Sequence, residues 1–175
     1  TSIDWNQATS KVEMNCTGEL IAGKWVLTAA LCTWPSAGGL RDVNFSPAYS
    51  EENAGISTVK QIVHPDYVVD GPDISLWEQS KPVDYSTINL LSTYNPSAGE
   101  LVGLQGFGET WNLNSATVEV IDKEYAKPYS MFVKDIGQGH SEPGDSGGAI
   151  TDQNRFIIAI NSSDHGGGEY VTSYI

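Results

Sequence analysis

The clearest chemical feature of the sequence is a serine framed by glycines. Ser146 stands in the run Pro143-Gly144-Asp145-Ser146-Gly147-Gly148. Glycine adopts backbone conformations closed to other residues, so peptide N–H groups in such a run can converge on one point, as an oxyanion hole requires. By itself the run also fits a plain glycine-rich turn.

Two further segments make the plain turn an insufficient explanation. Thr28-Ala29-Ala30-Leu31-Cys32 follows an apolar Trp-Val-Leu stretch, and Pro72-Asp73-Ile74-Ser75-Leu76 follows His64-Pro65-Asp66-Tyr67. Together with the serine run they occur in a fixed order along the chain.

These segments resemble the chymotrypsin/trypsin-like serine peptidases, which read WVLTAAHC, HPxY, DIxL and GDSGG in the same order. Weaker matches extend the resemblance over nearly the whole chain: CTGELI at 16–21 for CGGSLI, KPV at 81–83, GFGET at 106–110 for GWGxT, and GEYVT at 168–172 for GVYT. The resemblance implies an all-β, trypsin-like fold of two six-stranded antiparallel barrels, packed perpendicular with short loops and a cleft between them. It implies Ser146 as the nucleophile, Asp73 as the orienting carboxylate, and the amides of Gly144 and Ser146 as the oxyanion hole.

One position departs from this pattern. The residue immediately before Cys32, which is histidine in the family, is Leu31. A leucine side chain can neither accept the proton of Ser146 nor return it to a leaving amine. The sequence therefore predicts a peptidase homologue without peptidase activity, in which the buried Asp73 carboxylate finds backbone amides, hydroxyls or water in place of an imidazole, or is protonated.

The three other histidines do not supply the missing base. His64 lies in the loop before Asp73, where the family keeps it on the surface. His140 falls at the family position at the base of the primary specificity pocket, where it would either favour an acidic substrate side chain or form a plain pocket wall. His165 lies in a glycine-rich loop near the rim.

The substrate-binding edge also differs from the family. Its Ser-Trp-Gly aligns without gaps to Asn161-Ser162-Ser163, which replaces an aromatic wall with polar side chains. Asn161 also begins an N-glycosylation sequon, as do Asn15 and Asn44. A glycan on Asn161 would obstruct the cleft.

We expect Asp145 to have a different partner from the one it has in many animal members of the family. In those proteins a freed Ile-Val-Gly-Gly terminus pairs with this aspartate, and the sequence shows no Ile-Val-Gly-Gly segment. The candidate partners are Arg41, Arg155, a lysine, a hydroxyl or backbone amides.

Composition narrows the range of functions. The 175 residues carry 22 acidic and 9 basic side chains and a formal charge of −13. This balance excludes a nucleic-acid binder that uses a basic surface, and it favours encounter with basic partners. No apolar run is long enough to cross a membrane. We expect a monomer that needs neither a cofactor nor a metal and that binds a protein partner.

The cysteines indicate the compartment. Cys16 and Cys32 are the only two, and their spacing fits neither a CxxC redox pair nor a zinc cluster. A single disulfide, stabilising by roughly 3 kcal/mol in an oxidising environment, is the first interpretation, and two unrelated buried thiols are the alternative. In the family a disulfide lies beside the catalytic histidine, and these cysteines match it. A secreted protein is expected.

Short strands separated by turns must position these residues, a pattern typical of barrels and sandwiches. The segment 18–30 predicts a hairpin that turns at Ala22-Gly23-Lys24. Further strands are expected at 40–45, 56–63, 74–77, 100–105, 116–121, 131–133, 148–151 and 156–160. A Ser/Asn/Pro-rich stretch at 91–99 divides the chain into an N-terminal barrel lobe, 1–90, and a C-terminal barrel lobe, 91–175, within one structural unit.

Two functions follow from these residues. The first is a secreted, inactive serine peptidase homologue that acts by protein binding, as a decoy, an inhibitor or an effector. The alternative is an active serine endopeptidase in which Leu31 replaces the natural base or the base is supplied unusually.

Overall fold

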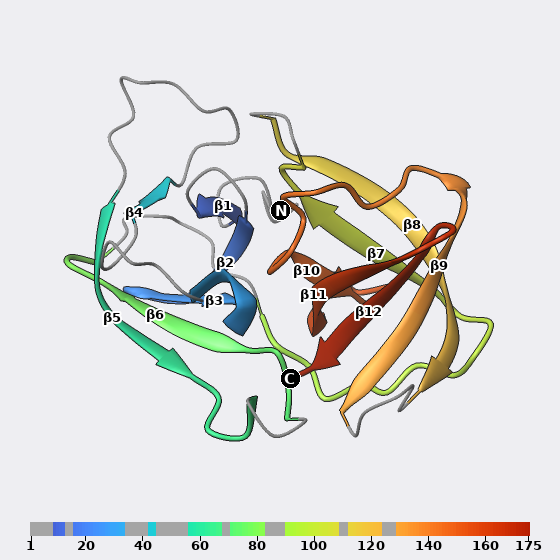
Figure 1. Cartoon of the computed structure of the whole chain (residues 1–175), viewed down its shortest axis with the longest axis horizontal. Coiled ribbons are helices and arrows are strands. Elements are labelled where there is room, and N and C mark those ends of the chain that lie inside the picture. Colours follow the sequence, from blue (N-terminus) through green and yellow to red (C-terminus); the bar gives the residue numbers. More distant parts are fainter. Residues whose placement is uncertain are drawn as a thin grey trace.

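The structure is a computed structural model that describes residues 9–12, 16–33, 42–44, 56–67, 71–82, 90–108, 112–123 and 129–175. It forms two closed barrels of six strands, ordered β1-β2-β3-β6-β5-β4 and β10-β11-β12-β9-β8-β7 (Figure 1). All paired strands within the barrels are antiparallel. The expected all-β, trypsin-like fold of two six-stranded antiparallel barrels is confirmed.

In the first barrel, strand β6 shows the alternation of buried and half-buried side chains that is typical of a barrel wall. In β6 the side chains of Ser75, Trp77 and Gln79 are buried, while those between them are only half-buried. The elements of this barrel are β1 (Thr9–Val12), β2 (Cys16–Ala22), β3 (Trp25–Thr28), the 3-10 helix η2 (Ala30–Thr33), β4 (Asp42–Asn44), β5 (Ile56–Val63) and β6 (Ser75–Gln79).

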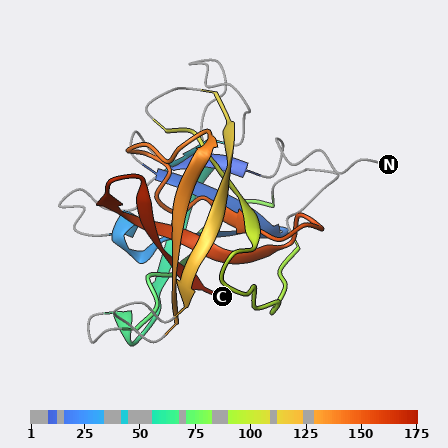
Figure 2. The ribbon, with the colours of Figure 1, turned by 90° about the vertical axis from the view of Figure 1, so that its right-hand side faces the viewer.

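The second barrel is built from longer strands. Figure 2 looks onto its outer side, where β8 and β9 lie next to each other. Its strands are β7 (Leu101–Gly106), β8 (Asn114–Lys123), β9 (Ser130–Gln138), β10 (Ala149–Thr151), β11 (Ile157–Gly166) and β12 (Glu169–Tyr174). Within the described part of the chain no helix is long and apolar enough to cross a membrane.

The hydrophobic core joins the two barrels. One cluster combines Leu20, Val26 and Trp77 of the first barrel with Ile157 and Ile160 of the second. Strand β2 explains this continuity, because its first five residues are all buried. Over these five residues alternate β2 side chains face the barrel interior and the second barrel, and the strand reaches solvent only at its end, where Ala22 is exposed.

Four strands differ most from the expectations: β1 and β12 were not among the expected strands, and β9 and β11 run several residues beyond their expected ends. Strand β1 has no apolar alternation, and it forms because its register pairs it with both β2 and β4. Strand β11 runs well beyond the expected end at Ile160 and pairs with β12 across a glycine turn in which Gly166, Gly167 and Gly168 have positive φ. The expected strand at 40–45 is described only over β4.

Candidate active site

Ser146 lies in a tight loop that leads into β10, and contacts from the first barrel hold this loop. The amide of Thr17 donates to the Ser146 carbonyl at 2.8 Å, and Cys32 Sγ lies 3.7 Å from the same oxygen. Gly144 has a φ of +103°, and a Cβ there would approach the Gly108 carbonyl oxygen to 2.2 Å. Only glycine fits this position.

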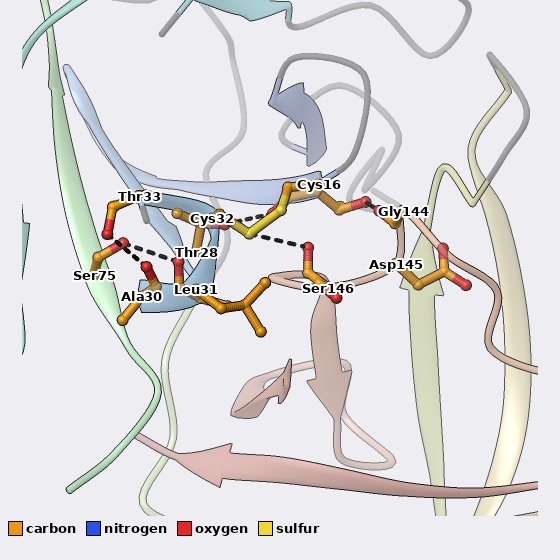
Figure 3. The surroundings of a disulfide bond; sticks show 12 residues. Cys16, Thr28, Ala30, Leu31, Cys32, Thr33, Ser75, Gly144, Asp145 and Ser146 are labelled. Carbon is orange, nitrogen blue, oxygen red and sulfur yellow. Dashed lines mark hydrogen bonds between the residues drawn. A yellow bond between two sulfur atoms is a disulfide. The ribbon is translucent and has the colours of Figure 1, made fainter. Parts of the chain in front are cut away.

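The disulfide between Cys16 and Cys32 is formed, as expected, and joins the start of β2 to η2. It therefore fixes the turn that carries Leu31 to the strand that holds the Ser146 loop (Figure 3). Within the described residues no group of three or more His, Cys, Asp or Glu side chains could hold a metal ion.

Asp73 is 8% exposed, and its carboxylate is hydrogen bonded to a backbone amide and a hydroxyl. Oδ1 accepts from the amide of Leu31 at 2.8 Å, and Oδ2 accepts from the hydroxyl of Ser162 at 2.6 Å. The Asp73 amide donates to Ser173 Oγ at 2.9 Å. The expectation that a backbone amide and a hydroxyl would satisfy this carboxylate is confirmed, and charge-assisted bonds of this kind are among the strong ones.

Leu31 occupies the place between the carboxylate and the serine. The η2 turn directs its amide toward Asp73, and its half-buried side chain packs against the core of the first barrel. Figure 3 shows this side chain extending from η2 toward Ser146. The Leu31 position therefore combines a backbone contact to Asp73 with an aliphatic side chain that cannot exchange a proton.

The hydroxyl of Ser146 has a peptide oxygen as its partner. Ser146 Oγ donates to the Ser162 carbonyl at 3.2 Å. The described histidine rings are engaged elsewhere: His64 Nδ1 accepts from the Asp66 amide at 3.3 Å, and His140 Nε2 lies 3.1 Å from a carboxylate oxygen of Glu142. The side chain of His165 lies outside the described part of the chain.

His140 is not enclosed at the base of a pocket. Its side chain is 62% exposed, and it pairs with Glu142. His140 instead borders a cavity of about 270 Å³ that it shares with Asp145 and with Ala116 of β8.

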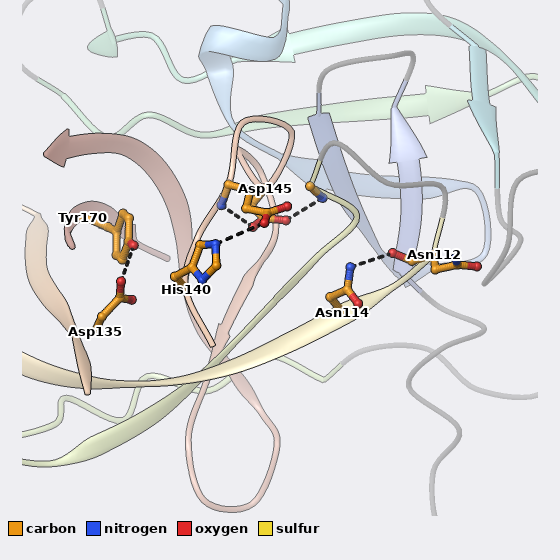
Figure 4. A network of polar contacts seen from close by, with 8 residues as sticks. Asn112, Asn114, Asp135, His140, Asp145 and Tyr170 are labelled. Carbon is orange, nitrogen blue, oxygen red and sulfur yellow. Dashed lines mark hydrogen bonds and ion pairs between the residues drawn. The ribbon is translucent and has the colours of Figure 1, made fainter. Parts of the chain in front are cut away.

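Asp145 pairs with backbone amides, which was one of the alternatives left open. Its two carboxylate oxygens accept from the amide of Gly108 at 2.7 Å and from the amide of Glu142 at 2.8 Å (Figure 4). Burial raises the pKa of Asp145, and the two amide hydrogen bonds oppose that rise. A Cβ at Gly106 would come within 2.2 Å of an Asp145 oxygen, which explains the glycines of the GFG segment.

The residues of the segment Asn161-Ser162-Ser163 differ in burial. The register of β11 against β12 shifts between Asn161 and Ser163, so both Asn161 and Ser162 are buried while Ser163 is exposed. Asn161 Nδ2 donates to Ser141 Oγ at 3.1 Å and to the Asp145 carbonyl at 3.3 Å. The nitrogen that would carry a glycan is therefore turned inward. Asn15 lies outside the described residues, as does the side chain of Asn44.

Sequence reasoning missed two residues of β2. Thr17 Oγ1 donates to the Gly144 carbonyl at 3.0 Å and accepts from the Phe107 amide at 3.1 Å. Glu19, which is completely buried, accepts from the Ala149 amide at 3.1 Å. The signal was present in the segment CTGELI, because these are the two positions at which it departs from CGGSLI.

Comparisons of the sequence and of the fold with known proteins identify the family of this chain. A family model described as Trypsin matches residues 2–175. A mouse (Mus musculus) tryptase is 38% identical over 76 residues, which is 41% of this chain and 28% of the tryptase, so the match spans under a third of that relative. A solved structure of neuropsin, a serine protease expressed in the limbic system of mouse brain, superposes with a TM-score of 0.80 at 21% identity, covering 97% of this chain and 90% of that one. This chain therefore belongs to the trypsin family.

Proposed function

We propose that this trypsin-family chain does not hydrolyse peptide bonds and acts by binding a protein, as a decoy, an inhibitor of another enzyme or an effector. The observation that carries the proposal is the partner of Ser146. Its hydroxyl donates to the Ser162 peptide carbonyl, with Leu31 extending toward it from η2. A peptide carbonyl does not accept a proton at neutral pH, so the hydroxyl is not activated.

The loss of catalytic rate expected without a histidine base supports the proposal that the chain is inactive. In subtilisin, removal of the triad histidine lowers turnover by about 10⁶, which corresponds to roughly 8 kcal/mol of barrier. Oxyanion and binding effects alone leave about 10³–10⁴ over the uncatalysed rate. Amide hydrolysis is so slow without a catalyst that this remainder gives no useful turnover.

The disulfide supports an extracellular site of action. The bond between Cys16 and Cys32 persists in oxidising compartments and is rare in the cytosol. We propose on this basis that the chain is secreted.

An active serine endopeptidase is the second candidate, and one observation favours it. Asp73 still accepts from Ser162 and from the backbone of residue 31, so the support for an imidazole remains in place. Only the ring is missing from this arrangement. A base supplied from elsewhere would complete it.

The test compares wild type with Ser146→Ala, Leu31→His and the double variant Leu31→His/Ser146→Ala. Each protein is treated with a fluorophosphonate probe, which labels activated serines, and with a mixed peptide library. We expect no labelling and no cleavage by wild type, and Ser146-dependent labelling of Leu31→His. Cleavage by wild type that Ser146→Ala abolishes would refute the proposal.

A further inference from the structure

The exposed apolar side chains of this protein gather on one face. Among the described residues, every exposed large hydrophobic side chain except Val59 and Ile62 belongs to the segment 90–101, to Tyr129 or to the C-terminal end. Figure 1 shows the yellow-green segment passing beside that end. We call this surface the tyrosine face and define it by Leu90, Leu91, Tyr94, Leu101, Tyr129, Tyr174 and Ile175. Exposed apolar surface gathered in this way marks an interaction site.

Two cavities hollow the tyrosine face, one on each side of Tyr94. One, of about 560 Å³, is lined by Tyr94, Tyr129, Tyr174 and Ile175 with small polar neighbours. The other, of about 540 Å³, is lined by Tyr94, Leu101 and Phe156 together with Glu100 and Asp152. Both are lined by Ser92 and Tyr94, so the Tyr94 ring forms the ridge that separates them.

Tyr94 is held in this position before any partner arrives. Its hydroxyl lies 2.8 Å from both carboxylate oxygens of Glu100, and its amide donates to Ser92 Oγ at 3.1 Å. The main chain beneath is fixed to β11, because the amide of Ile157 donates to the Leu90 carbonyl at 2.8 Å and the Ile157 carbonyl accepts from the Ser92 amide at 2.9 Å. A side chain that is already ordered loses little conformational entropy on binding.

Tyr129 is a second, independent indication that the tyrosine face binds a partner. Its φ is +68°, a left-handed conformation that glycine or asparagine adopts far more easily than tyrosine. The Tyr129 side chain is 61% exposed, so internal packing does not account for the choice of residue. Backbone strain of this kind is often retained for function.

The charge of the tyrosine face defines the partner. Glu100 and Asp152 line the second cavity, and neither cavity has a lysine or arginine among the described residues that line it. The hydrogen bond to Glu100 raises the pKa of Tyr94, and the negative charges of Glu100 and Asp152 contribute to the rise. An aromatic ring beside carboxylates suits a cationic side chain, through both a cation–π contact and an ion pair.

We infer that the tyrosine face is a docking site for a protein segment that presents an arginine or lysine flanked by apolar side chains. The cation lies over the Tyr94 ring, within reach of the carboxylates of Glu100 and Asp152, and the apolar flanks cover Leu101 and Tyr129. None of the residues that line the two cavities is Ser146, Asp73, Leu31 or Ser162. The inference therefore holds whether or not Ser146 is reactive.

The test uses two matched peptides, acetyl-Leu-Arg-Leu-amide and the same peptide with citrulline, which has nearly the shape of arginine without its charge. Each is titrated into the isotope-labelled full chain, and amide chemical shifts are followed by NMR. We expect shifts confined to residues 92–95, 100–102, 129, 152–156 and 174–175. The arginine peptide is expected to bind about fivefold more tightly, the scale of one exposed cation–π or ion-pair contact.

Variants then separate the tyrosine face from the rest of the surface. Glu100→Gln retains a hydrogen-bond acceptor for Tyr94 and should abolish the preference for arginine, whereas Asp66→Asn makes the same charge change on an exposed loop and should leave it intact. Tyr129→Gly should weaken binding by about threefold while leaving stability equal or higher, because glycine relieves the left-handed backbone. Equal binding of both peptides, shifts centred on Ser146, or self-association through this face that excludes the peptide would each overturn the inference.

Discussion

The hydroxyl of Ser162 should carry a measurable part of the stability of this fold. It donates at 2.6 Å to Asp73, and both side chains are more than nine-tenths buried, at 9% and 8% exposed. A buried hydrogen bond to a charged group contributes about 1.5–3 kcal/mol. Ser162→Ala is therefore expected to lower the free energy of unfolding by about 2 kcal/mol, which for a chain of this size corresponds to roughly 4–8 °C in Tm.

The matched control is the next residue in the strand. Ser163 is exposed, so Ser163→Ala should change stability by less than about 0.5 kcal/mol. Urea unfolding followed by circular dichroism measures both variants at neutral pH. A loss for Ser162→Ala no larger than that for Ser163→Ala would refute the reasoning.

A double-mutant cycle tests the cause of the effect. Asp73→Asn removes the charge but keeps an oxygen that can accept from Ser162. In that background the cost of Ser162→Ala should fall to about 1 kcal/mol, the value for a neutral hydrogen bond. An unchanged cost would mean that packing around Ser162, and not its bond to the carboxylate, sets the stability.

Three further outcomes are expected. Gly144→Ala should destabilise by more than about 2 kcal/mol in urea unfolding, because its Cβ would meet the Gly108 carbonyl at a left-handed backbone; a wild-type midpoint would contradict this. Burial raises the pKa of Asp145 above 3.8, so the native state holds that proton more tightly than the unfolded state does. The free energy of unfolding of wild type, minus that of Asp145→Asn, should therefore fall as pH rises from acid through the raised pKa. A difference that does not change with pH would contradict this. Burial, with the hydrogen bond to Asp135, raises the pKa of Tyr170 to about 12, so its stabilising contribution is complete below pH 10 and lost as pH rises through about 12. Tyr170→Phe should therefore remove one phenol that ionises near pH 12 from the ultraviolet absorbance titration of the folded protein, and an unchanged titration would contradict this.

The architecture was predicted from the ordered motifs that resemble the trypsin-like family, while local patterns placed individual strands. Apolar runs predicted the β2–β3 hairpin, β5, β6 and parts of β7 to β11, and the glycine cluster at 166–168 marked the turn between β11 and β12. Strand β1 could not be predicted, since its residues carry no apolar period and it exists only through pairing with β2 and β4. Long-range pairing of that kind leaves no local signature.

The site was predictable in type and less so in detail. Motif order identified Ser146, Asp73 and the position of Leu31, because those residues lie in recognisable segments. The role of Ser162 depends on a register shift within β11, and His140 lies exposed against Glu142 in the segment that follows β9. Ungapped alignment detects neither feature.

The contacts of Thr17 and Glu19 couple the unfolding of the two barrels. Strand β2 belongs to the first barrel, yet its residues satisfy the carbonyls of Gly144 and Ser146 and the amide of Ala149 in the second. A C-terminal half produced alone would leave these groups without their partners and would expose Ile157 and Ile160. The two barrels should therefore melt in a single cooperative transition, and neither is expected to persist once the other has opened.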